Sequence, residues 1–387
     1  MCPILEKFKS FESISSIISN GDSVFGASPP AVFVGRYGYP QVSAGPMIPP
    51  LANENVAPLF EDPKQWLEMK IEDIISRRSQ LVRANTHLNV RNFEDNPLLL
   101  KSQEIALSKK PVDTEAWFSK PLHKNLRFDD VLTPMGPSGT VEKLDIIDNP
   151  KVPKKVDYLA YDTDALAKDA VSELYQSSTP TEHITRLLSI GLLGKDRCLV
   201  PTRWSITAVD DMTGKDLIND IRDYPQISDI TLFSGSSFGN HFEIMFLPRS
   251  FSFEIIEMWM PKAIWSGDKT WIGADYEDTG GKRKYSNLAG GYYAARLGAL
   301  EYLKMVRRQA AVFIVREIRP DYWAPLGVWV VREAVRQALK NPPLTFDSIS
   351  LALSDMCTRL RTPYSDWKPK AKMLSDIQFQ KTLDSFL

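Results

Sequence analysis

Hydrophobic and polar positions along the chain repeat with two different periods, which predict both helices and strands. Asp62 is a good N-cap and Pro63 fits the first helical position, so a helix is predicted to begin there. A second capping box at residues 179–182 predicts a helix that continues to Ile190. The apolar positions after Pro63 recur with helical spacing and would face a core: Leu67, Ile71, Ile74, Ile75 and Val82.

Strands are predicted where β-branched and aromatic residues gather between Gly, Asn and Pro. A short one, residues 31–34, is followed by Gly-marked turns in a segment rich in Gly and Pro. A polar, Gly-containing loop is predicted at residues 262–287. Four further candidates are expected to be neighbours in a largely antiparallel sheet: residues 204–209, 230–233, 241–247 and 252–260.

The end of the chain is predicted to be richer in helices. We therefore expect an α+β fold, in which a largely antiparallel sheet with surrounding helices forms a large N-terminal region at residues 1–265. A smaller, helix-rich C-terminal region would follow at residues 266–375, and a flexible C-terminal tail at residues 376–387. The predicted elements after the loop are a helix at 288–308, a strand at 311–318, and helices at 327–339 and 346–360.

The charge of the chain is nearly balanced. Among 387 residues, 47 are basic and 48 are acidic, which gives a net charge of -1. Such a chain has no global attraction to nucleic acid, so any work on DNA needs a local basic patch or a partner that brings the protein there. No apolar run is long enough to span a bilayer, and the N-terminus has no signal-peptide layout. A cytoplasmic location without membrane association is expected.

The cysteines predict neither a disulfide framework nor a local zinc site. Cys2, Cys198 and Cys357 are far apart in the sequence and form no CxxC pair. The two internal cysteines are interpreted as small buried hydrophobic residues.

The last eight residues, 380–387, match the pattern of a docking peptide for a DNA sliding clamp. A single tight turn would place Leu383, Phe386 and Leu387 on one side as an apolar plug, while Gln380 hydrogen-bonds at the edge of the pocket. Residues 377–379 could add a strand to the partner's sheet edge. Leu387 stands where the pattern has an aromatic residue. The alternative is an ordinary C-terminal helix end that docks on its own domain.

Three segments together resemble the archaeal Nre proteins, a family linked to DNA repair and described as partners of the sliding clamp PCNA. They are the opening at residues 2–8, the block at residues 33–40 and the terminal clamp motif. The resemblance covers both predicted regions and implies a role in the response to DNA damage, but it does not supply a reaction. Relatives often begin with a Cys-rich, zinc-finger-like element, of which only Cys2 is present here. No bound zinc is therefore predicted.

A phosphate-binding turn is predicted at residues 35–38. Glycines let backbone approach a ligand closely, Arg36 could bind a phosphate with two hydrogen bonds, and Tyr37 could stack on a base. The alternative is a structural turn with a surface arginine.

A catalytic set is considered in the predicted sheet. His241 and Glu243 lie two apart on a strand candidate and so share a face, and Asp210 and Asp211 end another. A histidine with several carboxylates could hold a divalent metal ion for phosphodiester chemistry. The alternative is an ordinary strand with one polar face. No Ser-His-Asp or Cys-His arrangement can be inferred from the sequence.

Two further phosphate-binding candidates are basic segments near predicted strand or helix ends. Lys282 and Arg283 follow a pair of glycines before the helix predicted from residue 288, whose N-terminus would add its dipole. Arg316 and Arg319 lie at the polar end of the strand predicted at 311–318. The alternatives are a solvated charged hairpin and ion pairing with Glu317.

The leading hypothesis is a DNA repair protein that a C-terminal PCNA-interacting motif recruits to DNA, with a body that binds a nucleic-acid or nucleotide ligand. A metal-dependent phosphodiester or nucleotide hydrolase and a non-catalytic repair adaptor are the alternatives.

Overall fold

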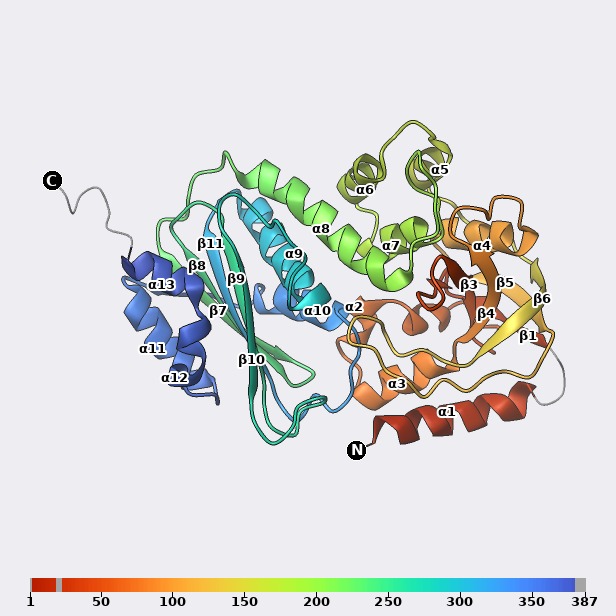
Figure 1. Ribbon diagram of the computed structural model, residues 1–387, viewed down its shortest axis with the longest axis horizontal. Helices are drawn as coiled ribbons and strands as arrows, with labels where there is room; N and C mark the ends of the chain where they lie inside the picture. The colour runs from red at the N-terminus through yellow and green to blue at the C-terminus, as the bar shows by residue number, and fades with distance from the viewer. Residues whose placement is uncertain (1, 19–22, 380–387) are drawn as a thin grey trace. The chain divides into compact units, whose positions relative to one another are not determined.

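A computed structural model describes residues 2–18 and 23–379 of the chain. The chain divides into two compact units (Figure 1). Unit 1 comprises Met1–Thr213 with Ala324–Gly327, and unit 2 comprises Gly214–Trp323 with Val328–Leu387. The residues predicted to bind the clamp lie outside the described residues: Gln380, Leu383, Phe386 and Leu387.

Unit 1 contains a six-stranded mixed sheet with the order β1-β5-β6-β4-β3-β2. Neighbouring strands are antiparallel except β4 and β6, which are parallel. Residues 31–34, predicted as a strand, contain β2. The strands are β1 (Ser23–Ser28), β2 (Val32–Val34), β3 (Gln41–Ile48), β4 (Val82–Asn89), β5 (Val112–Phe118) and β6 (Ser138–Ile146).

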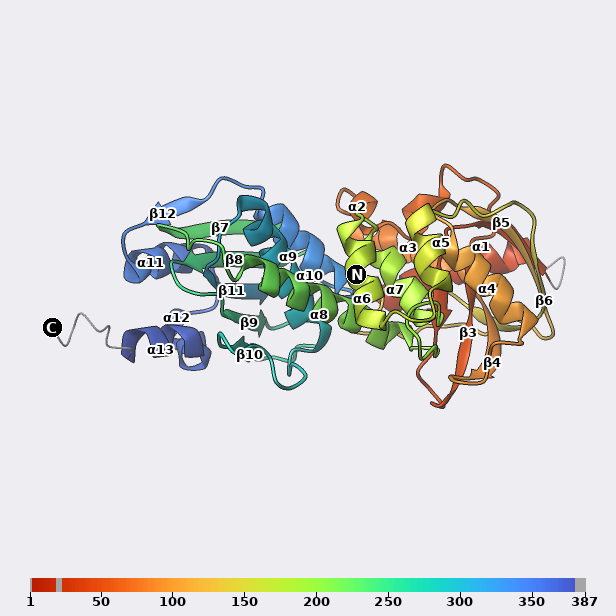
Figure 2. The same cartoon turned by 90° about the horizontal axis from the view of Figure 1, so that it is seen from above.

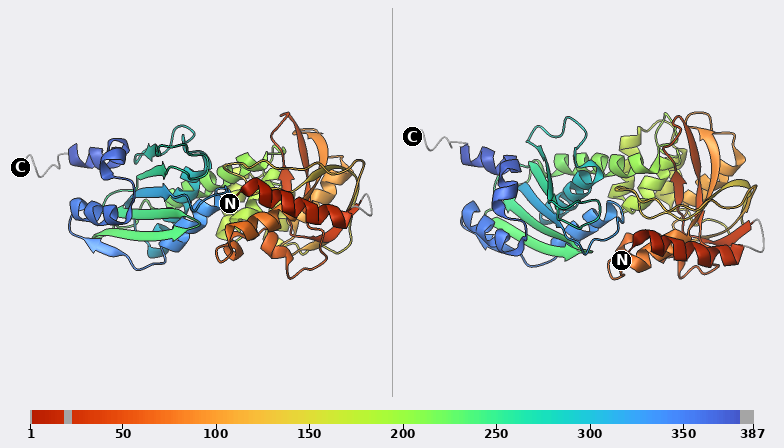
Figure 3. Two further views of the ribbon diagram at one scale, coloured as in Figure 1. Left: turned by 90° about the horizontal axis from the view of Figure 1, so that it is seen from below. Right: turned by 60° about the horizontal axis from the view of Figure 1, so that its bottom comes forward.

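The helices of unit 1 build its cores against this sheet. α4 and α7 contribute Leu99, Ile184 and Leu187 to a cluster that also holds Val34 and Val42 from the sheet. α1 lies along α3, as Figure 3 shows. The elements are α1 (Pro3–Ile18), η1 (Ala57–Phe60), α2 (Pro63–Trp66), α3 (Ile71–Gln80), α4 (Pro97–Leu107), α5 (Lys154–Tyr161), α6 (Ala167–Gln176) and α7 (Thr181–Ser189). α8 (Thr202–Ile221) begins in unit 1, and its residues from Gly214 on belong to unit 2.

Unit 2 contains a second six-stranded sheet, with the order β10-β9-β11-β8-β7-β12. Only β11 and β9 pair in parallel; the other described neighbours are antiparallel. The strands are β7 (Ile230–Ser237), β8 (Asn240–Leu247), β9 (Phe253–Trp259), β10 (Trp271–Glu277), β11 (Ala311–Ile318) and β12 (Leu344–Phe346).

Helices cover both faces of the unit 2 sheet. In Figures 1 and 2, α9 (Ala289–Val306) and α10 (Trp329–Ala338) lie on one face. The other face carries α11 (Ile349–Arg359), α12 (Tyr364–Trp367), η2 (Lys368–Lys370) and α13 (Lys372–Phe379). Two sheets surrounded by helices confirm the predicted α+β class. None of the described helices combines the length and hydrophobicity needed to cross a bilayer.

The strand predicted at residues 204–209 is wrong, because these residues belong to α8. Their β-branched and aromatic side chains favour a strand, but this local preference is weak where side chains pack with another period. One row of buried positions repeats every four residues, which is the spacing of one face of a helix: Ser205, Val209, Thr213, Leu217 and Ile221.

Two other predictions need correction. The helix predicted from Pro63 begins there, with the Asp62 side chain accepting a hydrogen bond from Lys64 N, but it ends after one turn and α3 starts anew at Ile71. The loop predicted at residues 262–287 contains β10, which pairs with β9 along its whole length. The side chains of β10 are mostly half-buried, as expected at a sheet edge, so the strand lacks the apolar alternation that would have revealed it.

Candidate functional site

A basic cavity in unit 1 lies beside the turn that joins β2 to β3. The turn contains Gly38, whose φ of +85° suits glycine, and Gly35, where an added Cβ would lie 2.7 Å from Ser43 Oγ. The cavity has a volume of about 320 Å³ and is lined by Arg36 and Tyr37 of this turn. Five cationic side chains and one carboxylate line it among the described residues: Arg36, Arg83, Lys124, Arg127, Arg203 and Asp129.

Asp129 balances part of this charge. Arg36 Nη2 lies 3.7 Å from Asp129 Oδ2, and Arg203 forms ion pairs with Asp129 and Asp130. Arg203 comes from the first turn of α8, so the helix that was predicted as a strand delivers a cation to the cavity. Two of the arginines are thus held in place by carboxylates at the wall.

Arg83, on β4, has no such balance. Its Cζ lies 5.1 Å from the centroid of the Phe33 ring, its Nη1 lies 3.8 Å from Met135 Sδ, and its Nε has no hydrogen-bond partner. No carboxylate of the described chain forms an ion pair with it. Burial lowers the pKa of Arg83 to about 10, which leaves the guanidinium charged at neutral pH. A cation that is partly desolvated and unpaired favours an anion in the cavity that it lines.

Lys7, on α1, contacts two of the residues that line the cavity, Arg127 and Phe128. Its ammonium group donates a hydrogen bond to Arg127 O and lies 4.2 Å from the centroid of the Phe128 ring. Burial, and then the charges of Arg83 and Arg78, lower the pKa of Lys7 to about 7. Burial is the larger cause of this shift, and the nearby charge of Arg83 acts in the same direction.

Exposed aromatic side chains lie near the cationic ones. Tyr37, Tyr39 and Trp204 are 74%, 53% and 44% exposed. The rings of Tyr39 and Trp204 have centroids 5.2 Å apart, and Arg36 Cζ lies 5.3 Å from the Tyr37 ring. Aromatic faces next to arginines suit a ligand that has both bases and phosphates.

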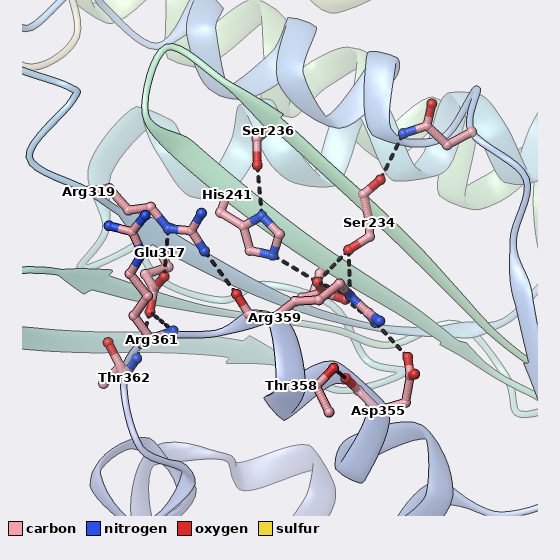
Figure 4. Close-up of polar contacts among 12 residues, drawn as sticks. Ser234, Ser236, His241, Glu317, Arg319, Asp355, Thr358, Arg359, Arg361 and Thr362 are labelled. Carbon is pink, nitrogen blue, oxygen red and sulfur yellow. Dashed lines mark hydrogen bonds and ion pairs between the residues drawn. The ribbon is translucent and has the colours of Figure 1, made fainter.

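A second polar site lies on β7 and β8 of unit 2 (Figure 4). His241 and Glu243 share a face of β8, as predicted, and His241 Nε2 lies 2.8 Å from Glu243 Oε1. Glu243 is fully buried and also accepts hydrogen bonds from Arg359 Nε at 2.8 Å, Arg359 Nη2 at 2.9 Å and Ser234 Oγ. Burial by itself raises the pKa of Glu243, but the hydrogen bonds from His241, Arg359 and Ser234 bring it below its usual value.

The other ring nitrogen of His241 contacts a serine, Ser236, that no motif in the sequence marks. Ser236 Oγ lies 2.7 Å from His241 Nδ1. Ser236 is opposite His241 in the strand register, and Ser234 is opposite Glu243. These two serines are found only once the register of β7 with β8 is known. The short turn between the two strands is the signal in the sequence from which that register can be counted.

Asp210 and Asp211, the other members of the predicted catalytic set, lie on α8 and not at a strand end. Asp210 is buried and Asp211 is half-buried, and both have interaction partners. Within residues 2–18 and 23–379, no group of three or more His, Cys, Asp or Glu side chains is placed to hold a metal ion.

Most of the other predicted phosphate-binding residues are engaged in ion pairs within unit 2. Lys282 pairs with Asp275, and Arg316 Nη1 lies 2.8 Å from Glu257 Oε1. Arg319 Nε lies 2.9 Å from Glu317 Oε2, and its Nη2 donates to Arg359 O. Arg283 is exposed. The unit 1 cavity thus brings together Arg36 and Tyr37, while these four residues do not line it.

Comparisons with known proteins show which family the chain resembles. A model described as archaeal Nre, N-terminal, matches residues 1–266, and one described as archaeal Nre, C-terminal, matches residues 277–386. DNA repair protein NreA of Archaeoglobus fulgidus is 42% identical over 370 residues, covering 95% of this chain and 91% of that protein. DNA repair protein NreB of the same organism is 35% identical over 388 residues, covering 100% and 96%. DNA repair protein NreA of Haloferax volcanii is 34% identical over 387 residues, covering 97% and 92%. No solved structure matches significantly.

Proposed function

The chain belongs to the archaeal Nre family, and we propose that it is a DNA repair protein that a sliding clamp recruits and whose unit 1 cavity binds a phosphate-bearing nucleic-acid ligand. Relatives that cover nearly the whole chain carry the name DNA repair protein, which supports the first part. The fold class alone would not, because one fold serves many functions.

The observation that carries the ligand proposal is the unpaired guanidinium of Arg83 at the wall of the cavity. A phosphate would supply the negative charge that the surrounding side chains lack, with hydrogen bonds that an arginine can make in pairs. Arg36, at the turn, would contact the same or a neighbouring phosphate. Tyr37 would stack on a base, because every base offers a ring face to an exposed aromatic side chain.

The balanced charge of the chain fits a clamp-recruited protein. A net charge of -1 gives little general affinity for DNA, so a tether that raises the local concentration compensates for it. The motif Gln380, Leu383, Phe386 and Leu387 is the proposed tether, and an archaeal PCNA is its proposed partner. The cavity then selects what is bound once the protein has reached DNA.

Binding of a short, fluorescently labelled single-stranded oligonucleotide tests the cavity. We expect Arg83→Gln and Arg36→Gln each to weaken binding by about tenfold, as the loss of an arginine contact does. Each should also reduce the slope of log K against log salt by about 0.7, which is the change for one phosphate contact on a single strand. Arg91→Gln is the matched control, because Arg91 is exposed on unit 1 and does not line the cavity.

Thermal melting of each variant separates binding from folding. Arg36 is more exposed than Arg83 and gives a variant whose fold is expected to be intact. If folded Arg36→Gln and Arg83→Gln bind the oligonucleotide as tightly as Arg91→Gln does, the proposed ligand site is wrong.

A peptide covering residues 376–387 tests the tether separately. We expect the peptide to bind an archaeal PCNA with a dissociation constant on the order of 1 μM. Phe386→Ala should abolish binding, because the phenyl ring is a main anchor of the apolar plug. Leu387→Phe should tighten binding by restoring the aromatic residue of the pattern. A wild-type peptide that does not bind would leave the alternative, a helix end docked on its own domain.

A further inference from the structure

The β7–β8 hairpin places an exposed serine directly against a buried histidine. Phe238 and Gly239 form a two-residue turn with φ of +51° and +75°, the geometry of a tight hairpin. This turn fixes the register in which Ser236 is opposite His241. The Ser236 side chain is exposed, whereas the His241 ring is buried and 7% exposed. One hydroxyl group at the surface is thus in contact with an imidazole behind it.

The hydrogen bonds form a chain with a defined direction. Glu243 accepts from three side chains and is ionised, so the His241 Nε2 that faces it carries the proton and donates. In this tautomer His241 Nδ1 has a free lone pair, which lies 2.7 Å from Ser236 Oγ. The serine hydroxyl therefore donates to a nitrogen that is ready to take its proton.

The carboxylate end of this chain is held rigidly. Arg359 binds both oxygens of Glu243, and Asp355 Oδ2 lies 2.7 Å from Arg359 Nη2 and restrains the guanidinium in turn. Figure 4 shows Arg359 reaching from α11 to the strands that carry Ser234 and His241. A buried, ionised and fixed carboxylate orients the imidazole and stabilises the imidazolium that forms when it accepts a proton.

The edge of β7 next to Ser236 is not covered by its neighbouring strand. β12 pairs with β7 only at residues 230–232, which lie at the end of β7 away from the turn. In a two-residue hairpin the pair next to the turn is hydrogen-bonded and the following pair is not, so the Ser236 N–H points away from β8 toward this open edge. The carbonyl oxygen of Ser234, two residues earlier, points the same way and accepts from Asn341 Nδ2 at 2.8 Å.

We propose that Ser236 is a nucleophile for acyl transfer, that His241 is its general base, and that Glu243 is the positioning residue that orients the imidazole. The substrate class is a carboxylic ester, whose carbonyl oxygen would accept a hydrogen bond from Ser236 N–H at the open edge of β7. This activity goes beyond the proposed function, because it uses residues of unit 2 and does not depend on the unit 1 cavity or on the clamp motif.

The proposed reaction balances without a metal ion or an oxidant. Ser236 Oγ attacks the carbonyl carbon and passes its proton to His241 Nδ1, and the resulting imidazolium returns the proton to the leaving alkoxide as the ester bond breaks. Water, deprotonated by the same nitrogen, then attacks the acyl-serine, and the carboxylic acid leaves while Ser236 regains its proton. The products are an alcohol and a carboxylic acid.

A fluorophosphonate probe tests the nucleophile on the full-length protein. The Ser236 Oγ–P bond forms, the P–F bond breaks, and the serine proton passes to His241 while fluoride leaves. Mass spectrometry of the labelled peptides should place the adduct on Ser236. Ser236→Ala should lose the adduct, and Ser237→Ala, the matched control one residue along the same strand, should be labelled at the wild-type rate.

The base and the positioning residue are tested by the labelling rate. His241→Gln should slow labelling by about a hundredfold, the usual contribution of a general base. Glu243→Gln should lower the limiting rate while leaving the half-saturating probe concentration unchanged, and Glu243→Asp should restore part of the rate. A purely structural role for Glu243 would not lower the limiting rate while leaving the half-saturating probe concentration unchanged.

Two results would overturn the proposal: no adduct on Ser236 in the folded wild-type protein, or labelling of Ser236 at the wild-type rate in His241→Gln. If His241→Gln or Glu243→Gln does not fold, the labelling pattern of the wild-type protein tests the proposal by itself. An activated Ser236 is labelled well ahead of Ser234 and Ser237, whereas equal labelling of the three serines shows that no activation exists.

Discussion

At the scale of single residues, buried ionisable groups differ in whether the protein supplies an opposite charge for them. Glu243 is buried with three donors around it, whereas Arg83 lines a cavity with no carboxylate of the described chain paired to it. The first arrangement is complete within the protein, and the second is the one that we propose a phosphate completes. His183 is a third case, a buried base that stays neutral.

His183, on α7, predicts a loss of stability in mild acid. Burial, and then the charge of Arg186, lower the pKa of His183 from 6.5 to about 2. Below pH 6.5 the unfolded chain binds a proton that the folded protein does not, so the free energy of unfolding falls as pH falls. We expect a decline of about 1.4 kcal/mol per pH unit from this group between about pH 6 and 5.

Urea unfolding of the wild-type protein and His183→Gln at several pH values measures this decline. Glutamine does not titrate, so the difference between the two proteins isolates the histidine from the carboxylates. Parallel curves for the two proteins below about pH 6 would contradict the prediction.

Arg359 predicts a large loss of stability when it is removed. Arg359→Met leaves the fully buried Glu243 without its cation, and breaking a buried pair in this way costs about 3 kcal/mol. Lys155→Met is the control, because the pair of Lys155 with Glu173 is exposed and contributes about 1 kcal/mol or less. Chemical denaturation of both variants measures the difference, and equal losses would show that Glu243 finds other compensation.

The sequence singles out residues that a local pattern marks, and the binding role of such residues stays a prediction. Arg36 and Tyr37 were selected because glycines flank them, and both line the cavity. Arg83 is not marked by its own segment, because its neighbours come from distant parts of the chain, and the contact of Ser236 depends on the register of a hairpin that composition alone does not give. Arg83 is surrounded by Phe33 and Met135, and Ser236 faces a histidine across a hairpin.

At the scale of elements, the sequence predicts those whose period matches their local composition. β8, β9 and β11 are rich in apolar β-branched, aromatic and other large side chains, and each is predicted as a strand close to its observed bounds. α8 is not predicted because its first residues favour a strand, although one row of its buried positions repeats every four residues. β10 was missed because an edge strand carries polar and half-buried side chains.

Glu254 predicts how the first turn of α13 responds to pH. Its carboxylate accepts hydrogen bonds from Lys372 N and Met373 N, both at 2.7 Å. Burial raises the pKa of Glu254 from 4.5 to about 7 even though these amides oppose the shift. Between pH 4.5 and 7 the folded protein binds more protons than the unfolded chain, so this group lowers stability as pH rises, by at most about 1.4 kcal/mol per pH unit.

Glu254→Gln should remove this pH dependence and leave one of the two amides without its acceptor. We expect the unfolding free energy of the variant to change less than that of the wild-type protein between about pH 5 and 7. Hydrogen exchange at Lys372 and Met373 should be faster in the variant, because the amides at a helix start depend on such a cap. Unchanged exchange at both amides would show that Glu254 does not hold the helix.

At the scale of the whole molecule, a balanced total charge conceals a local concentration of cations. The net charge of -1 is consistent with weak general affinity for DNA, yet five cationic side chains line a single cavity of unit 1. The balanced charge predicts that work on DNA needs a local basic patch, but the sequence marks only Arg36 among the five cations that line the cavity. The cations come from separate segments of the chain, and only the folded unit brings them together.

A protein with a clamp tether and a separate ligand site should show avidity. On DNA that carries a loaded archaeal PCNA, both sites act at once, so Phe386→Ala should raise the apparent dissociation constant of the full-length protein by about a hundredfold. On the same DNA without the clamp, the variant should bind like the wild-type protein, because the tail has no partner there. Arg83→Gln should weaken binding by about tenfold with or without the clamp, and the double variant should show the product of the two effects. Anisotropy measurements on the four proteins test this, and a Phe386→Ala effect of equal size without the clamp would mean that the tail acts on DNA or on the fold and not as a tether.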